Sequence, residues 1–213
     1  MKALVTGFEP FGSDPVNTSL EAIRRLPARL GELDLATRVL PTAFGRALEA
    51  LADAVATTRP DIVLCLGLAG GRAALSLERV AIKVDDARLA DNDERQPVDT
   101  PVVADGPAAY FTTLPIKAAA AALREAGLPA IVSNTAGTFV CNHVFYGLMH
   151  LAATRRPGMR GGFLHLPYLP QQVVRQDGAP SMALDDIVRG VEIVLRVAAA
   201  RQDDIVTVEG AIS

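Results

Sequence analysis

The chain has 213 residues, of which 50% are hydrophobic and 21% are charged, and its formal net charge is −3. This composition supports a large buried core and offers no basic excess for a phosphate backbone, which argues against nucleic acid as a partner. No apolar run approaches the roughly 18 residues of a membrane span, and the apolar start is too short for a secretory signal. We therefore expect a cytoplasmic protein without a membrane partner, folded as a single α/β domain over residues 1–213, with reduced cysteines.

Strand and helix patterns alternate along the first third of the sequence. Strands are predicted at residues 2–8, 35–40 and 61–68, and helices at about 18–26 and 44–58. The third strand is apolar throughout, which is typical of a strand buried on both faces. This alternation predicts an α/β fold with a mainly parallel central sheet flanked by helices on both faces, a three-layer αβα arrangement of the phosphorylase/hydrolase-like kind.

The middle of the chain is predicted to form one long strand followed by a long loop. Residues 76–84 alternate as a strand should, and Glu78 falls on its apolar face. Residues 85–107 are rich in Asp and Pro and show no period, which favours a lid or a binding segment. The remaining predicted elements are a helix at 115–126, a short strand near 129–132, a helix that begins near Cys141, a strand at 161–166 and a helix at about 181–201.

Cys141 is the leading candidate for a nucleophile. It follows a stretch of Ser, Asn, Thr and Gly and precedes apolar residues at helical spacing, which places it in the first turn of a helix. Unpaired N–H groups and the helix dipole at that position favour the thiolate and lower the thiol pKa. From this segment alone, a buried structural cysteine is the commoner alternative.

Two further residues suit a catalytic cysteine. His143 and His150 face away from Cys141 on the predicted helix, because a two-residue step turns a helix by roughly 200°. His165 instead ends a strand, where ligands collect in parallel sheets and a neutral imidazole can accept the thiol proton. Its alternative is a satisfied structural histidine. Glu78 is the candidate to hold the imidazole, with an ion pair to a neighbouring arginine as an equal alternative.

Other patterns are weaker. The glycine-rich turn at residues 67–72 lacks the spacing of either phosphate-binding fingerprint, which argues against a nucleotide site. Cys141 and the two histidines of its helix do not converge on one face, which argues against a metal site. Phe8 and Phe11 lie among turn residues and are either core anchors or an apolar wall for a small ligand.

Several sequence blocks resemble one known family. They are Thr6-Gly-Phe-Glu-Pro-Phe-Gly12, Leu77-Glu-Arg-Val-Ala81, Asp91-Asn-Asp, Gln96-Pro97, Leu114-Pro-Ile-Lys117, the segment from Ser133 to His143, Phe145-Tyr-Gly147 and His165-Leu-Pro-Tyr-Leu-Pro170. In this order they resemble pyroglutamyl peptidase I, also called pyrrolidone-carboxylate peptidase, a family of cysteine omega-peptidases that remove N-terminal pyroglutamate from peptides.

The resemblance implies a mechanism and a site. It implies a catalytic triad of Cys141, His165 and Glu78 that acts through an acyl-enzyme without a metal or organic cofactor. Peptides with an N-terminal pyroglutamate are the implied substrates, and a homo-oligomer, a tetramer, is the implied assembly. For the substrate, the resemblance implies that the pyroglutamyl ring lies among Phe8, Phe11, Phe139 and Val140. It also implies that Asn17 hydrogen-bonds the lactam and that Arg88 lies near the oxyanion.

Two positions depart from the family pattern. Leu68 stands where the family usually has Gln, and Thr18 replaces a Pro after Asn17. A changed side chain at position 68 leaves two alternative functions open. One is a related cysteine amidase with a shifted acyl specificity, and the other is a non-catalytic relic of the fold that binds a small ligand.

Overall fold

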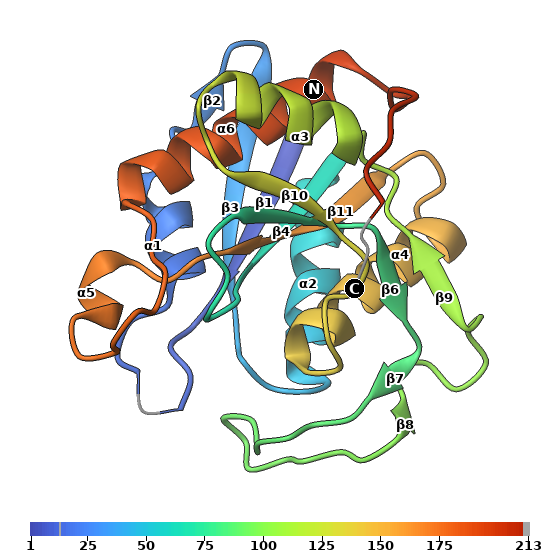
Figure 1. The fold of residues 1–213 in the computed structure, drawn as a ribbon. Helices are drawn as coiled ribbons and strands as arrows, with labels where there is room; N and C mark the ends of the chain where they lie inside the picture. The colour runs from blue at the N-terminus through green and yellow to red at the C-terminus, as the bar shows by residue number, and fades with distance from the viewer. Residues whose placement is uncertain (13, 211–213) are drawn as a thin grey trace.

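A seven-stranded sheet forms the centre of the computed structural model, which describes residues 1–12 and 14–210 (Figure 1). The strand order is β10-β5-β11-β4-β1-β3-β2, and the strands pair in parallel except β11 with β5 and β3 with β2. The predicted mainly parallel sheet is thus confirmed. Its strands are β1 (Lys2–Phe8), β2 (Arg29–Leu30), β3 (Leu33–Leu40), β4 (Ile62–Leu68), β5 (Leu75–Glu78), β10 (Ala130–Ser133) and β11 (Arg160–Leu166).

Helices cover both faces of this sheet, as predicted (Figure 1). One face carries α1 (Thr18–Arg25), α3 (Ile116–Glu125) and α6 (Leu184–Ala200), and the other carries α2 (Arg46–Thr58) and α4 (Val140–Thr154). A short helix, α5 (Pro170–Val173), follows β11. None of the helices within the described ranges combines the length and the apolar character that a membrane crossing requires.

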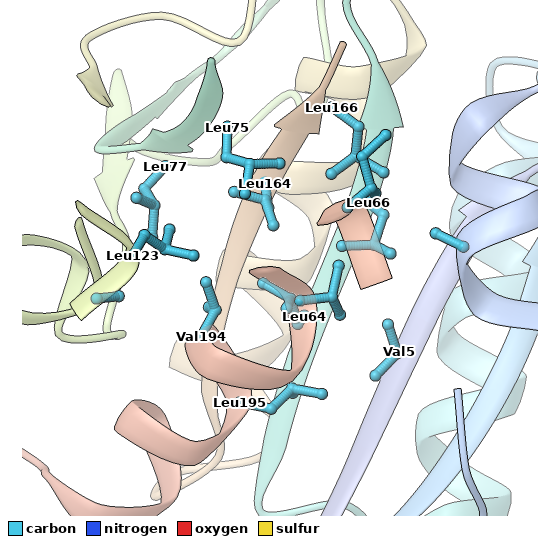
Figure 2. Packing of buried hydrophobic residues seen from close by; sticks show 14 of the residues in the cluster. Val5, Leu64, Leu66, Leu75, Leu77, Leu123, Leu164, Leu166, Val194 and Leu195 are labelled. Carbon is cyan, nitrogen blue, oxygen red and sulfur yellow. The ribbon is translucent and has the colours of Figure 1, made fainter. Parts of the chain in front are cut away.

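The adjacent strands β4 and β11, whose ends border the candidate site, are buried on both faces. Leu64 and Leu66 of β4 and Leu164 of β11 belong to the cluster that also holds Leu195 of α6 (Figure 2). The alternate residues of β4, among them Cys65, belong to the cluster on the opposite face. Removal of apolar surface on both sides contributes about 25 cal/mol per Å², so the ends of these strands are held in a fixed position.

The single strand predicted at residues 76–84 is wrong. The chain forms three short strands there: β5 ends at Glu78, β6 (Val80–Ile82) pairs with β9 (Ala109–Phe111), and β7 (Val84–Asp85) pairs with β8 (Thr100–Pro101). The change of partner occurs at Arg79, whose N–H donates to the Ser133 carbonyl while its carbonyl accepts from the Thr112 N–H. Both halves stay extended, so the period in the sequence does not reveal the break.

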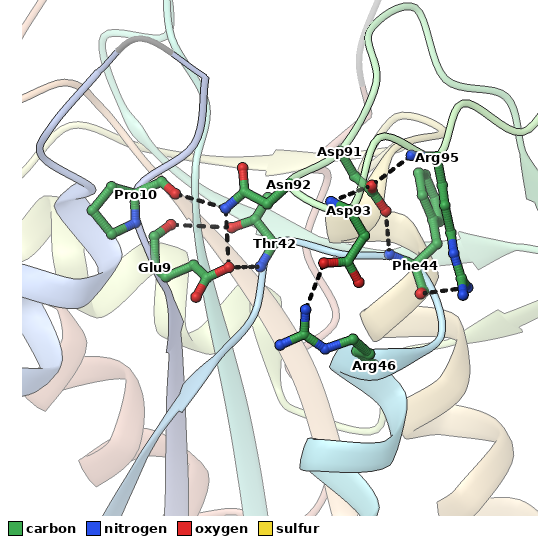
Figure 3. Close-up of polar contacts among 9 residues, drawn as sticks. All are labelled: Glu9, Pro10, Thr42, Phe44, Arg46, Asp91, Asn92, Asp93 and Arg95. Carbon is green, nitrogen blue, oxygen red and sulfur yellow. Dashed lines mark hydrogen bonds and ion pairs between the residues drawn. The ribbon is translucent and has the colours of Figure 1, made fainter.

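The segment predicted as a long loop is largely irregular, and polar side chains fix it to its neighbours (Figure 3). The Asn92 amide donates to Glu9 Oε1 at 2.9 Å, and Asp91 Oδ2 accepts from the Phe44 N–H at 2.7 Å. Glu9 follows β1 and Phe44 lies between β3 and α2. The loop is therefore fixed to the turn after β1 and to the turn between β3 and α2, and both turns border the site described next.

The residues after α6 follow α3. Asp204 accepts hydrogen bonds from the backbone N–H groups of Lys117 and Ala118 at 2.9 and 2.8 Å, so it caps the first turn of α3. Farther along, the Glu209 carboxylate forms two hydrogen bonds with the Arg124 guanidinium. The sequence pattern predicts no placement for this tail, because such caps come from residues distant in the chain.

Candidate active site

Cys141 is the second residue of α4, in the first helical turn where the sequence pattern puts it. Phe139, which precedes the helix in an extended conformation, has no polar side chain to cap the first N–H groups. The first N–H groups of a helix have no intrahelical acceptor, so those of Val140 and Cys141 remain available to an anion beside the thiol.

His165 and Glu78 form a buried hydrogen-bonded pair. The His165 Nδ1 atom lies 2.7 Å from Glu78 Oε1, and both side chains are almost entirely excluded from solvent. The antiparallel pairing of β5 with β11 sets Phe163 opposite Glu78, which makes Glu78 a diagonal neighbour of His165 on the same face. Arg72 Nη1 also donates to Glu78 Oε1 at 2.7 Å, so Glu78 takes up both of the roles considered from the sequence.

Gly67 brings the thiol close to the imidazole. It lies opposite His165 in the β4–β11 pairing, and a Cβ atom on it would lie 2.9 Å from Cys141 Sγ. That same Cβ atom would lie 2.8 Å from the Phe163 ring, whose centroid is 4.8 Å from the His165 ring. Only a residue without a side chain lets α4 approach this closely. Among the described residues, no hydrogen bond joins the Cys141 thiol to His165.

The surroundings favour the neutral forms of both groups. Burial, reinforced by the nearby Glu78 charge, raises the pKa of the half-buried Cys141 thiol to about 12, while Arg72 acts in the opposite direction. Burial lowers the pKa of His165 below 6.5 despite its hydrogen bond to Glu78. The expectation of an acidic thiol is therefore wrong, because burial of the sulfur and the Glu78 charge outweigh the effect of the helix start. A neutral thiol beside a neutral imidazole suits general-base activation of the nucleophile.

A cavity of about 150 Å³ opens onto the thiol. Its small volume suits a compact, largely apolar group rather than a long side chain. Five of the six substrate-contact residues named from the sequence line it, whereas Arg88 is exposed and lies outside the lining. The full lining is Phe8, Phe11, Asp14, Val16, Asn17, Thr42, Leu68, Phe139, Val140, Cys141 and Tyr168.

Sequence reasoning missed four of these lining residues and one partner of Glu78. Tyr168 belongs to the block His165-Leu-Pro-Tyr-Leu-Pro170, and Thr42 follows the strand predicted at residues 35–40. The sequence therefore holds a signal for each of them in its position after a strand. Asp14 and Val16 had none beyond their place in the turn after β1. Arg72 belongs to the glycine-rich turn at residues 67–72, and its guanidinium binds a carboxylate of the protein itself.

The other two histidines are engaged elsewhere. His143 Nδ1 lies 2.7 Å from Asp85 Oδ2, and its Nε2 accepts the Gly45 N–H at 3.0 Å. His150 Nδ1 lies 2.9 Å from the Tyr110 hydroxyl. In the part of the chain that the structure describes, no group of three or more His, Cys, Asp or Glu side chains is arranged to hold a metal ion.

A neutral imidazole held by a carboxylate, on the same side of the sheet as a helix-start thiol, is an arrangement that cysteine hydrolases use. Comparison with known proteins gives the particular family. The family model described as pyroglutamyl peptidase matches residues 1–202. The chain belongs to the pyroglutamyl peptidase family, as its sequence blocks indicated, and it is a hydrolase of the thiol peptidase class.

Individual relatives support this assignment along almost the whole chain. Pyrrolidone-carboxylate peptidase 1 of Ralstonia nicotianae is 56% identical over 203 residues, which covers 95% of this chain and 94% of that protein. The pyrrolidone-carboxylate peptidase of Clostridium botulinum is 46% identical over 212 residues, with both chains covered completely.

Solved structures share the fold. The crystal structure of pyroglutamyl peptidase I from Bacillus amyloliquefaciens superposes with a TM-score of 0.93 at 47% identity, covering 96% of this chain and 99% of that one. A mutant pyrrolidone carboxyl peptidase from Pyrococcus furiosus superposes with a TM-score of 0.90 at 40% identity, covering 94% and 99%. The α/β fold with a mixed, mostly parallel sheet is therefore that of the family.

Proposed function

We propose that this chain removes N-terminal pyroglutamate from peptides with Cys141 as nucleophile, His165 as general base and acid, and Glu78 as the group that orients the imidazole. The observation that carries the proposal is the buried His165–Glu78 pair at the strand ends, beside a cysteine that lines a small apolar cavity. Family membership supports the substrate, because the curated relatives are pyrrolidone-carboxylate peptidases.

The reaction proceeds through two proton transfers at His165 Nε2 in each half, acylation and deacylation. This nitrogen takes the thiol proton as Cys141 Sγ attacks the carbonyl between pyroglutamate and the next residue. The N–H groups of the first α4 turn stabilise the resulting oxyanion, and Glu78 stabilises the imidazolium. The imidazolium then donates its proton to the leaving amine, which leaves a thioester. Water, deprotonated by the same nitrogen, then attacks the thioester, and the imidazolium returns its proton to the departing Cys141 sulfur, which frees pyroglutamate and restores the thiol.

The hydrogen bonds of Asn17 define what its amide offers to the lactam. Its Oδ1 accepts from both the backbone N–H and the hydroxyl of Ser19, at 3.0 and 2.7 Å, and one Nδ2 hydrogen goes to the Glu9 carbonyl. One amide hydrogen therefore remains, so Asn17 donates to the lactam carbonyl. The proposed role of Arg88 near the oxyanion rests on the family resemblance, with Arg88 exposed in the loop between β7 and β8.

The activity is tested with a fluorogenic pyroglutamyl amide. Wild-type protein is expected to release the fluorophore, Cys141→Ala to release none above background, and iodoacetamide to abolish the wild-type activity. Cys65→Ala is the matched control, since Cys65 is buried in β4 and is expected to remain dispensable for turnover. Undiminished cleavage by Cys141→Ala would sink the proposal.

The second candidate function is a cysteine amidase of shifted acyl specificity, which the position of Leu68 in the cavity lining favours. A panel of pyroglutamyl, prolyl and acetyl amides distinguishes the two. The peptidase predicts turnover of the pyroglutamyl amide alone, in wild type and in Leu68→Gln. Turnover of another acyl amide that Leu68→Gln abolishes would favour the amidase. A binding relic predicts no turnover of any amide.

Two properties of the molecule in the cell are also proposed. We propose that the chain forms a homotetramer, which follows from the family resemblance, and that it acts in the cytoplasm on peptides that carry the pyroglutamyl block. Light scattering coupled to gel filtration tests the assembly, for which a mass of four chains is expected. Fractionation of cells that express a tagged full-length chain tests the location.

A further inference from the structure

We propose that Arg72 is a positioning residue for this hydrolysis: it fixes the Glu78 carboxylate under the imidazole and ties the segment that precedes the nucleophile to the same carboxylate. The proposal rests on the triad proposed above. It concerns an arginine that contacts neither the cavity nor the reacting atoms and that acts through Glu78 and through the loop before α4.

The Arg72 guanidinium contacts two separate segments of the site. Its Nη1 donates to Glu78 Oε1 at 2.7 Å, the same oxygen that His165 Nδ1 contacts at 2.7 Å. Its Nη2 donates to the Thr135 carbonyl at 3.3 Å, in the loop between β10 and α4. A planar guanidinium is suited to such a fork, because its donors have a fixed mutual orientation.

The turn after β4 is built to aim this arginine inward. Gly71 has φ +85°, a left-handed conformation in which a residue with a side chain is strained. The Ala69 N–H donates to the Leu166 carbonyl and the Arg72 N–H donates to the Ala69 carbonyl, so the turn is tied to the end of β11. The Arg72 side chain is only 29% exposed and reaches Glu78, which is fully buried.

A buried carboxylate needs this partner. A carboxylate removed from water is strongly destabilised unless it is paired with a charge, and a neutral imidazole N–H supplies only a hydrogen bond. Arg72 supplies the charge. The cation also acts on the ring beyond, since it lowers the pKa of His165 while Glu78 raises it. Burial is the main cause of the lowered His165 pKa, and the Arg72 charge adds to it by opposing Glu78.

The charged and titratable groups that face His165 come from three elements. They are Glu78 from β5, Arg72 from the turn after β4 and the Cys141 thiol from α4. The apolar ring of Phe163 in β11 also packs against the imidazole, with the ring centroids 4.8 Å apart. Removal of Arg72 leaves Glu78 as the one ionised neighbour of the ring, so imidazolium formation becomes easier.

Arg79 provides a matched control within the chain. It is the sequence neighbour of Glu78, but its guanidinium contacts Asn134 Oδ1 at 2.9 Å and the Glu209 carbonyl at 3.0 Å. Arg79 thus contacts the same loop without a hydrogen bond to the Glu78 carboxylate. Loss of Arg79 removes a tether of the loop and preserves the electrostatics of the His165–Glu78 pair.

The experiment measures kcat/KM against pH for wild type, Arg72→Gln, Arg72→Lys and Arg79→Gln with the fluorogenic pyroglutamyl amide. For Arg72→Gln we expect the acid limb to move up by about one pH unit, which is about a tenfold loss on the acid side of the limb. Arg72→Lys keeps the charge and should keep the limb, with a lower plateau because the contact to Thr135 is lost. Arg79→Gln should keep the wild-type limb.

The outcomes separate this inference from the proposed function. If wild type cleaves the amide, Cys141→Ala does not, and Arg72→Gln shows the wild-type limb, the positioning role is overturned while the triad stands. If wild type does not cleave the amide, the proposed function fails first. A lower plateau could also come from a smaller folded fraction, so a thermal melt of each variant measures that fraction. The position of the limb on the pH axis does not depend on it.

Discussion

The molecule contains two buried histidine–carboxylate pairs that look alike and differ in what the second ring nitrogen contacts. His165 with Glu78 and His143 with Asp85 each show a separation of 2.7 Å from Nδ1 to a carboxylate oxygen, and all four side chains are buried. His143 lies two residues after Cys141 on α4, so both pairs lie near the nucleophile in the sequence or in space.

The second ring nitrogen gives each pair its role. In His143 it accepts the Gly45 N–H at 3.0 Å, directly before α2, so this ring ties the start of α2 to α4. In His165 it has no hydrogen-bond partner among the described residues, and the thiol lies on the same side of the sheet beside Gly67. A histidine with both nitrogens in use holds structure, whereas one with a single nitrogen in use can move protons.

The structural pair also supports the cavity. The His143 ring packs edge-on against Phe44 at 5.3 Å, Phe44 packs edge-on against Phe139 at 5.4 Å, and Phe139 meets Phe11 at 5.1 Å. Phe11 and Phe139 line the cavity. The His143–Asp85 pair is therefore connected to the cavity wall through a row of rings, whereas the role proposed for the His165–Glu78 pair is in the chemistry.

The largest contrast is expected from replacement of the two histidines. His165→Gln should lower kcat/KM on the order of 10⁴-fold, because the proposed base is removed, and should lower the melting temperature less than His143→Gln does, because one buried hydrogen bond is lost and Arg72 still pairs with Glu78. His143→Gln should keep kcat close to wild type and lower the melting temperature by several degrees, because buried polar groups lose partners worth about 1–3 kcal/mol each. Parallel steady-state kinetics and calorimetry measure both. Equal losses of activity would erase the distinction between the pairs.

The carboxylates should repeat the contrast with a smaller effect. Glu78→Gln removes the charge that stabilises the imidazolium and that Arg72 binds, so kcat should fall roughly 10²–10⁴-fold. Asp85→Asn retains an oxygen that can accept from His143 Nδ1–H and should leave kcat near the wild-type value. Pre-steady-state acylation at fixed pH measures the first effect directly. A deficit in Asp85→Asn as large as that in Glu78→Gln would contradict the assignment.

The sequence predicted most of the elements that position these pairs, because their signals are local. The strands at residues 2–8 and 61–68 and the helix at the nucleophile follow from apolar runs and helical spacing, and they are confirmed. The short strands β2, β9 and the four-residue α5 were missed, because segments of two to four residues carry too few positions to show a period. The break at Arg79 was missed for a different reason, since it is a change of strand partner within an extended segment.

The residues of the candidate site could be predicted from the sequence, but their contacts and the direction of the thiol pKa shift could not. His165 and Glu78 were nominated from their strands, yet their contact depends on the antiparallel β5–β11 pairing, which βα alternation does not predict. The acidic thiol was expected from the helix start alone. The burial that opposes it depends on tertiary packing, and the Glu78 charge comes from a segment more than sixty residues away, so no local pattern in the sequence reports either.

The pH dependence tests the neutral pair of thiol and imidazole. With the pKa of His165 below 6.5 and that of Cys141 about 12, kcat/KM should rise in one step below pH 6.5 as the imidazole loses its proton. It should then stay level through the region near 8.5 where an ordinary thiol titrates. Alkylation of Cys141 should likewise rise with pH without a plateau below pH 7, measured with iodoacetamide in the Cys65→Ala background. A plateau there would reveal a thiolate–imidazolium pair formed before substrate binds. His143→Gln should not move the step.

The smallest effect is expected where the structural pair meets the cavity. Phe44→Leu keeps the core filled and removes both edge-on aromatic contacts, each worth about 0.5–1.5 kcal/mol. Because Phe139 then loses its support, KM should rise about two- to tenfold with kcat unchanged. Tyr110→Leu is the matched control, since Tyr110 packs on Tyr146 and His150 farther along α4, away from the cavity lining. A fall in kcat with constant KM in Phe44→Leu would mean that the row of rings positions the nucleophile instead of the substrate, and the two pairs would then share one task.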